Sequence, residues 1–281
     1  AVMRVIPAKH LIPVIRKLCI EANIRLPRDV QNALKTGEFF ETWPAARCIL
    51  DKIVENFNLA DEKELPICQD TGVACVFLDI GEDVHINGSL YEAVDEGVRQ
   101  GYRDGYLRKS VVADPLKRIN TGDNTPAMLY TRFVPGDKIS ITVAPKGFGS
   151  ENMSQIKMLR PSDGEAGVVD FVVSAVEAAG PNPCPPIIVG VGIGGTFDKA
   201  ALLSKRALLR DLDVPNPDPY YATLEQTLLN KINALGIGPQ GFGGAVTALG
   251  VAIETMPTHI AGLPCAVNIN CHVARHATEV L

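Results

Sequence analysis

Four neighbouring residues carry four different functional groups. A thiol, an amide, a carboxylate and a hydroxyl follow one another at Cys68, Gln69, Asp70 and Thr71. A proline comes shortly before this group, a glycine ends it, and an apolar run over 73–80 follows. A turn of this composition that opens into a strand presents its side chains to a cleft, because no helix or sheet ladder directs them. Cysteine is a soft metal ligand and aspartate can transfer a proton, although a buried cysteine beside an Asx-turn is the simpler alternative.

The seven cysteines divide into two groups by their surroundings. Four are expected in the core, on apolar faces of helices or strands: Cys19, Cys48, Cys75 and Cys265. Three lie in loops or at strand ends, beside polar residues: Cys68, Cys184 and Cys271. Three thiolates from distant segments suit a [4Fe-4S] cluster with one iron free of protein ligands, and that iron can act as a Lewis acid. On spacing alone, purely structural cysteines remain the alternative.

Four further places in the sequence offer candidate site residues. Cys184 stands among four prolines, which hold a thiol on a rigid loop before any metal binds. The glycines of segment 145–152 let backbone N–H groups approach a ligand, with a flexible surface loop as the alternative. Arg108 is expected at the end of a helix, where the dipole alone explains a cation. His259 is a lone histidine, and such residues are usually structural or simply exposed.

Composition excludes several classes of protein. The 281 residues carry a formal charge of −5 and no basic run, which argues against nucleic-acid binding. No segment is apolar enough to span a membrane, and the first residues do not resemble a signal peptide. An odd number of widely spaced cysteines without a CxxC pair points to the reducing cytoplasm. No linker or repeat interrupts residues 1–281, so one catalytic domain is expected.

Hydrophobic periodicity predicts an α+β fold with mixed and antiparallel sheets. The predicted helices cover 10–24, 27–37, 44–57, 89–108, 164–179, 197–209 and 223–235. The predicted strands cover 73–80, 127–134, 138–144, 187–195, 246–255 and 265–270. Pro135-Gly136-Asp137 predicts an antiparallel hairpin between the second and third of these strands. Gly190, Gly192 and Gly195 match GxGxxG, but no second strand ending in an acidic residue follows, which argues against a dinucleotide site.

Several segments together resemble a known family. They are Cys68-Gln69-Asp70-Thr71-Gly72, the run from Lys146 to Asn152, Asn182-Pro183-Cys184-Pro185-Pro186, Gly190 to Gly194, Gly236 to Gly241, and the closing run from Cys271 to His276. In this order they are similar to class I, iron–sulfur-dependent fumarate hydratase, in its α subunit or N-terminal cluster domain. The related L(+)-tartrate dehydratase α subunit shares this architecture.

The resemblance implies a specific chemistry. It implies a [4Fe-4S] cluster on Cys68, Cys184 and Cys271, and reversible hydration of fumarate to L-malate. Gln69, Arg108, Gly147 and Gly149 match residues near the dicarboxylate substrate, and Asp70 and His259 match catalytic residues. Single-chain members continue into a C-terminal domain, whereas this chain stops at Leu281, so a β subunit is expected to supply the rest of the active site. A symmetric oligomer is expected as well.

Other functions stay open at this point. L(+)-tartrate dehydration is the alternative within the same architecture. An electron-transfer iron–sulfur subunit would carry a cluster whose spectrum ignores dicarboxylates. A Rossmann-type oxidoreductase would bind a nicotinamide nucleotide.

Overall fold

The computed structural model describes residues 3–281 and divides the chain into two compact units. Unit 1 comprises the segment ending at Pro27, then Phe57–Gly147 and Arg275–Leu281. Unit 2 comprises Arg28–Asn56 and Phe148–Ala274. Each has its own hydrophobic core. The single catalytic domain expected over 1–281 stays a prediction, since two compact units can belong to one domain.

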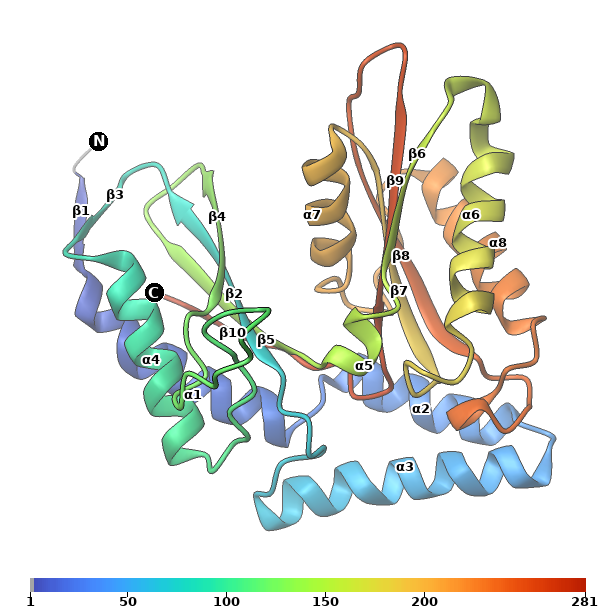
Figure 1. The fold of residues 1–281 in the computed structure, drawn as a ribbon, viewed down its shortest axis with the longest axis horizontal. Helices are drawn as coiled ribbons and strands as arrows, with labels where there is room; N and C mark the ends of the chain where they lie inside the picture. Colours follow the sequence, from blue (N-terminus) through green and yellow to red (C-terminus); the bar gives the residue numbers. More distant parts are fainter. Residues whose placement is uncertain (1–2) are drawn as a thin grey trace. The chain divides into compact units, whose positions relative to one another are not determined.

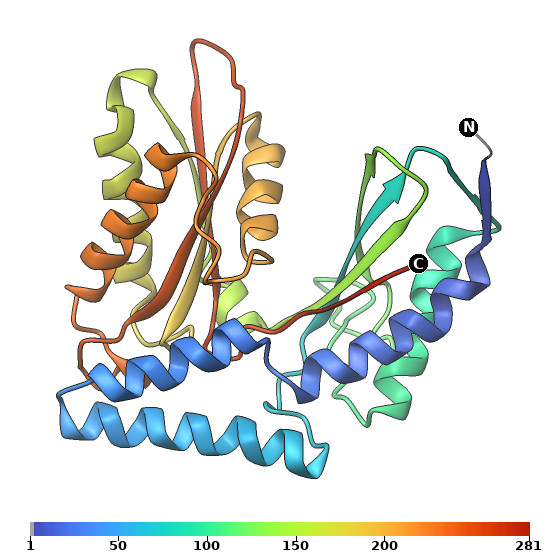
Figure 2. The same ribbon diagram turned by 180° about the vertical axis from the view of Figure 1, so that it is seen from behind.

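Unit 1 packs two helices on a four-stranded sheet (Figures 1 and 2). Its elements are β1 (Arg4–Pro7), α1 (Leu11–Ile24), β2 (Val73–Gly81), β3 (Val84–Asn87), α4 (Leu90–Asp104), β4 (Met128–Val134), β5 (Ile139–Lys146) and β10 (Ala277–Val280), with a 3-10 turn at Ala8–His10. The sheet order is β10-β5-β2-β4, and β1 and β3 form a separate parallel pair. Apolar residues of α1 and α4 recur at helical spacing, so both helices turn one face to this core.

The predicted hairpin between β4 and β5 is wrong. Both strands pair with β2, β4 in parallel and β5 antiparallel, so β2 lies between them. The four-residue connection over 135–138 spans two strand spacings, about 10 Å, across the end of β2. Gly81 makes this crossing feasible, because a Cβ there would lie 2.2 Å from the Gly136 carbonyl oxygen.

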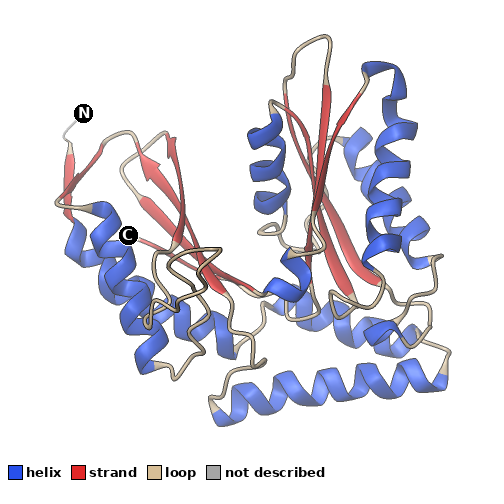
Figure 3. Cartoon of the chain, in the orientation of Figure 1, coloured by secondary structure: helices blue, strands red, loops and turns tan. Residues whose placement is uncertain are grey.

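Unit 2 places helices on both faces of a second four-stranded sheet (Figures 1 and 3). Its elements are α2 (Arg28–Phe40), α5 (Phe148–Glu151), β6 (Gln155–Leu159), α6 (Gly164–Ala179), β7 (Ile187–Gly194), α7 (Phe197–Ala207), α8 (Pro219–Asn233), β8 (Ala248–Met256) and β9 (Leu263–Asn270), with 3-10 turns at Pro161–Asp163 and Pro239–Gly241. The sheet order is β6-β9-β7-β8. Helix α7 covers one face, and α6 and α8 cover the other. Helix α3 (Pro44–Lys63) contributes residues to both units.

The glycines of the GxGxxG match serve packing in unit 2. A Cβ on Gly190 would lie 2.1 Å from the Ser204 carbonyl oxygen, and one on Gly192 equally close to that of Ala200. Helix α7 therefore lies directly on the backbone of β7, where a side chain would push it away.

The α+β class with mixed and antiparallel sheets is confirmed. Among residues 3–281, no helix has the length and apolar character that crossing a membrane requires. Four short strands, β1, β3, β6 and β10, were not predicted, because runs this brief carry little periodic signal.

Candidate functional site

The turn that holds Cys68 has a defined backbone. It connects α3 to β2, and its Asp70 N–H donates to Cys68 Sγ at 3.4 Å. Gly72 N–H donates to Asp70 Oδ1 at 3.0 Å, which closes an Asx-turn. Gly72 has a φ of +72°, and a Cβ there would lie 2.7 Å from the backbone of Lys146. Only glycine fits this position without distortion.

Three consecutive carbonyls of this turn accept hydrogen bonds from side chains of unit 1. The Arg275 guanidinium donates to the Asp70 carbonyl through Nη2. Tyr102 Oη donates to Thr71 O at 2.6 Å and lies 3.2 Å from Gly72 O. Burial raises the pKa of the Tyr102 phenol, so it stays a donor. The backbone of the turn is thus held at successive residues.

The loop that contains Arg108 is bound to the same turn. Thr71 Oγ1 donates to the carbonyl of Arg108 at 3.0 Å. Asn124, which is fully buried, donates to Gly72 O at 3.1 Å and accepts from the Ser110 N–H at 2.7 Å. These contacts fix the main chain at Arg108, while its side chain is exposed. An exposed guanidinium on a fixed backbone can bind an anion from solution.

Gly147 lies beside the carboxylate of Asp70. A Cβ at Gly147 would be 3.1 Å from Asp70 Oδ2, so a larger residue would press on this carboxylate. Unit 1 therefore brings together five predicted site residues: Cys68, Gln69, Asp70, Arg108 and Gly147. Gln69 is exposed, whereas Cys68 and Asp70 are half-buried.

In unit 2, Cys184 and the segment after Cys271 are in contact. Cys184 is exposed and adopts a left-handed φ of 54° in the proline-rich loop. Its carbonyl oxygen lies 2.9 Å from His272 Nδ1 and accepts the His272 backbone N–H at 3.4 Å. Two predicted ligands thus come from neighbouring loops, one of them directly after β9.

The other two predicted residues of unit 2 are Gly149, which lies in α5, and His259, which lies in a loop. A Cβ at Gly149 would be 3.6 Å from the Asn182 carbonyl oxygen, which places Gly149 beside the loop of Cys184. His259 is exposed after β8, and its Nδ1 accepts from the Ala261 N–H at 3.2 Å. Within residues 3–281, no three His, Cys, Asp or Glu side chains are grouped to hold a metal ion, and Cys68 belongs to unit 1. The full ligand set stays a prediction.

The remaining cysteines differ from the prediction at one position. Cys19, Cys75 and Cys265 are buried as expected, and burial raises the pKa of the Cys19 and Cys265 thiols to about 12. Cys48 was expected in the core but is exposed. The periodicity of α3 identified a helix, but not which of its faces other elements would cover.

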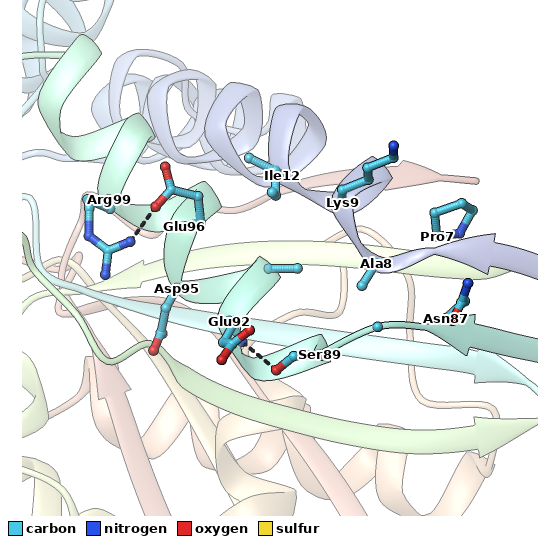
Figure 4. Close-up of a pocket in the computed structure, with 12 residues that line it drawn as sticks. Pro7, Ala8, Lys9, Ile12, Asn87, Ser89, Glu92, Asp95, Glu96 and Arg99 are labelled. Carbon is cyan, nitrogen blue, oxygen red and sulfur yellow. Dashed lines mark hydrogen bonds and ion pairs between the residues drawn. The ribbon is translucent and has the colours of Figure 1, made fainter.

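A groove of about 760 Å³ lies elsewhere in unit 1, at the start of α4 (Figure 4). Three acidic residues line it, Glu92, Asp95 and Glu96. Its Arg99 is bonded to Glu96 and to Asp123. The three carboxylates outnumber the two cations, Lys9 and the already paired Arg99, so the groove does not suit a dicarboxylate. None of the predicted site residues lines it.

Sequence reasoning missed the residues that hold the Cys68 turn. Tyr102 falls within the helix predicted over 89–108, and helical periodicity gives no role to its hydroxyl. Asn124 falls outside every predicted helix and strand. Arg275 belonged to the closing motif without a role of its own. A buried polar side chain has no periodic signature, so only an unexplained hydroxyl or cation in an apolar context could have indicated them.

Comparisons with known proteins identify the family of this chain. Residues 12–280 match the family described as fumarate hydratase (Fumerase). The putative L(+)-tartrate dehydratase subunit alpha of Methanocaldococcus jannaschii is 44% identical over 273 residues, 95% of each chain. The L(+)-tartrate dehydratase subunit alpha of Escherichia coli K12 is 34% identical over 258 residues, 90% of this chain and 85% of the relative. The resemblance to this family is confirmed, and the chain belongs to the fumarate hydratase (Fumerase) family of hydro-lyases.

Proposed function

We propose that this chain is the α subunit of an iron–sulfur hydro-lyase that reversibly hydrates fumarate to L-malate. The observation that carries the proposal is the turn that holds Cys68 in unit 1, whose backbone is fixed by hydrogen bonds from side chains. There the Cys68 thiol, the Asp70 carboxylate and the Arg108 loop are tied to one backbone by Arg275, Tyr102 and Thr71. An iron–sulfur hydro-lyase that acts on a dicarboxylate needs a metal ligand, a proton-transfer group and a carboxylate-binding cation at fixed positions relative to one another.

The residues present fit a [4Fe-4S] cluster at Cys68, Cys184 and Cys271. The donor set is three thiols in loops, and the half-buried Cys68 sulfur accepts a backbone N–H. Arg275, four residues after Cys271, is a buried cation with two nitrogen atoms, Nε and Nη1, that lack an acceptor within residues 3–281. Such a cation suits the negative charge of a cluster. When bound, the cluster would supply an open iron as a Lewis acid for the substrate hydroxyl and carboxylate.

The side chains of this chain divide the remaining work. Arg108 pairs with a substrate carboxylate, and the Gln69 amide donates a hydrogen bond to the substrate. Asp70 moves the proton at Oδ2, because Oδ1 already accepts the Gly72 N–H. The absence of a Cβ at Gly147 and Gly149 lets their backbone approach the substrate. We assign His259, on an exposed loop, to the catalytic set as well.

A β subunit would complete the active site. The relatives in Methanocaldococcus jannaschii and Escherichia coli are named as alpha subunits, which supports a heteromer here. We extend the proposal to a symmetric assembly of such pairs. Within residues 3–281 no disulfide joins any of the seven cysteines, which suits the reducing environment of the cytoplasm.

L(+)-tartrate dehydration is the second candidate. The names of the relatives favour it, whereas the segment Lys146 to Asn152 favours fumarate by its resemblance. Both reactions remove water from a hydroxy dicarboxylate and use the same groups.

One experiment separates these functions. The chain is co-expressed with its β subunit, reconstituted anaerobically with iron and sulfide, and assayed with fumarate, L-malate and L(+)-tartrate. The proposal expects the highest kcat/KM for the fumarate–malate pair, and a higher value for tartrate would transfer the function to the second candidate. A cluster whose EPR spectrum ignores all three compounds, in an inactive complex, would indicate electron transfer instead. Asp70→Asn, which keeps the size of the side chain, is the matched inactive control.

A further inference from the structure

Arg275 is a buried cation to which the proposed reaction assigns no contact with the substrate and no proton transfer. Only 4% of its surface is exposed. Its Nη2 donates to the main-chain carbonyl of Asp70, within unit 1. Its Nε and Nη1 are buried and have no hydrogen-bond partner within residues 3–281. The N–H groups of a buried guanidinium normally all donate hydrogen bonds, so the lack of acceptors for Nε and Nη1 calls for an explanation.

The partners of the same turn show what Arg275 adds. Tyr102 already holds the carbonyls of Thr71 and Gly72, and Asn124 also holds that of Gly72. Arg275 extends this row by one residue, to Asp70, whose carboxylate faces Gly147. The charge of Arg275 also acts on Tyr102, where it opposes the rise in phenol pKa that burial causes. Arg275 and Tyr102 therefore act together, because they hold neighbouring carbonyls of the same turn.

We propose that Arg275 is a positioning residue for the Cys68–Asp70 turn. It fixes the Asp70 backbone, and through it the directions of the Cys68 thiol and the Asp70 carboxylate. Its remaining N–H groups would donate hydrogen bonds to an anionic group bound at this turn. The sulfur atoms of a cluster are suitable acceptors. This inference rests on the proposed function.

Lysine cannot replace this arginine. A guanidinium is planar and can hold a carbonyl with one nitrogen while the other two donate in fixed directions. An ammonium at the same place keeps the charge but loses the fork. Arg275→Lys therefore separates positioning from simple charge balance.

The test uses the reconstituted α–β complex and a matched arginine in unit 2. Arg210 is also largely buried, and it is bonded to the Glu225 carboxylate and to the Ile253 carbonyl, with no contact to the Cys68 turn. Arg275→Lys and Arg210→Lys are compared by cluster content, EPR spectrum of the reduced cluster, kcat, KM and thermal midpoint. We expect Arg275→Lys to lower kcat per cluster about 100-fold, with KM changed less than about threefold, and to alter the EPR line shape. Arg210→Lys should lower only the thermal midpoint.

Several outcomes would overturn the inference. A folded Arg275→Lys complex with wild-type kcat and EPR spectrum would do so, and so would identical behaviour of the two variants. If Arg275→Lys does not fold, Tyr102→Phe loosens the same turn and keeps the aromatic ring. It should lower kcat about tenfold at constant KM, and an unchanged kcat and spectrum would refute positioning by this backbone. A wild-type complex inactive on every dicarboxylate would refute the proposed function instead, while the EPR comparison would still test Arg275.

Discussion

The hydroxyl of Tyr102 should contribute measurably to the stability of unit 1. Tyr102→Phe removes one oxygen atom and leaves the buried ring in place. Its hydroxyl donates to Thr71 O at 2.6 Å, and Thr71 is only 2% exposed. Gly72 O keeps its bond from Asn124 at 3.1 Å after the change. One buried carbonyl is therefore left without this donor, which costs about 2 kcal/mol of unfolding free energy.

The assay is urea denaturation of the full chain, followed by far-UV circular dichroism. The single tryptophan, Trp43, lies in unit 2, so its fluorescence would not follow the unit that carries the change. Tyr220→Phe is the matched control, because Tyr220 is 53% exposed and its hydroxyl reaches only the Glu165 carboxylate, at 2.6 Å. We expect the urea midpoint to fall by about 1 M for Tyr102→Phe and by less than about 0.2 M for the control. Equal midpoints for the two variants would refute the reasoning, because burial of the acceptor would then have no effect.

Three further predictions follow from the same structure. Glu41 is 2% exposed, and its carboxylate accepts hydrogen bonds from the backbone N–H groups of Trp43, Ala245 and Val246. Glu41→Gln should therefore lower the unfolding free energy of unit 2 by about 2 kcal/mol, as a urea titration followed by Trp43 fluorescence would measure. An unchanged urea midpoint would contradict this. Burial raises the pKa of Asp123, but hydrogen bonds from Thr125 and Arg99 outweigh it and hold this pKa at about 2. Because the folded pKa is depressed, the contribution of Asp123 to stability is present above pH ~4 and is lost as the pH falls toward 2. Asp123→Asn should therefore cost roughly 1 kcal/mol of unfolding free energy at pH 7 and almost nothing near pH 2, as urea midpoints at the two pH values would measure. An equal cost at both pH values would exclude the ionised carboxylate as the origin of the effect. Iodoacetamide should label the exposed Cys48 and Cys184 of the cluster-free native chain and spare Cys19 and Cys265, because burial raises the pKa of those two thiols to about 12. After the cluster is loaded, mass spectra should show that Cys184 is protected and Cys48 is not. Equal labelling of Cys48 and Cys184 in the loaded protein would argue against Cys184 as a ligand.

Local patterns predicted much of the fold. Helix α6 was predicted with the bounds that the structure has, because Gly164 and Gly180 mark its two ends. Strand β2 agrees to within one residue, since its apolar run starts directly after Gly72. The loops that hold Cys68, Cys184 and Cys271 were identified from proline, glycine and polar neighbours, which act over a few residues.

Strand pairing could not be read in the same way. The connection over Pro135–Asp137 has the composition of a hairpin turn, yet β2 lies between the two strands that it joins. A turn composition reports the direction of the chain, not which strand lies alongside. That choice depends on the burial of β2, whose residues are almost all covered, by segments far away in the sequence.

The sequence by itself determined the chemistry available to this protein and the family to which it belongs. Residue types and their order are covalent facts, and they specify which thiols, carboxylates and cations the chain carries. Only the tertiary structure decided which groups support one another. Arg275 is 205 residues from Asp70, and Asn124 is 52 residues from Gly72, yet both hold the same turn. Such contacts form because buried polar groups require partners, and a partner this distant leaves no local pattern in the sequence.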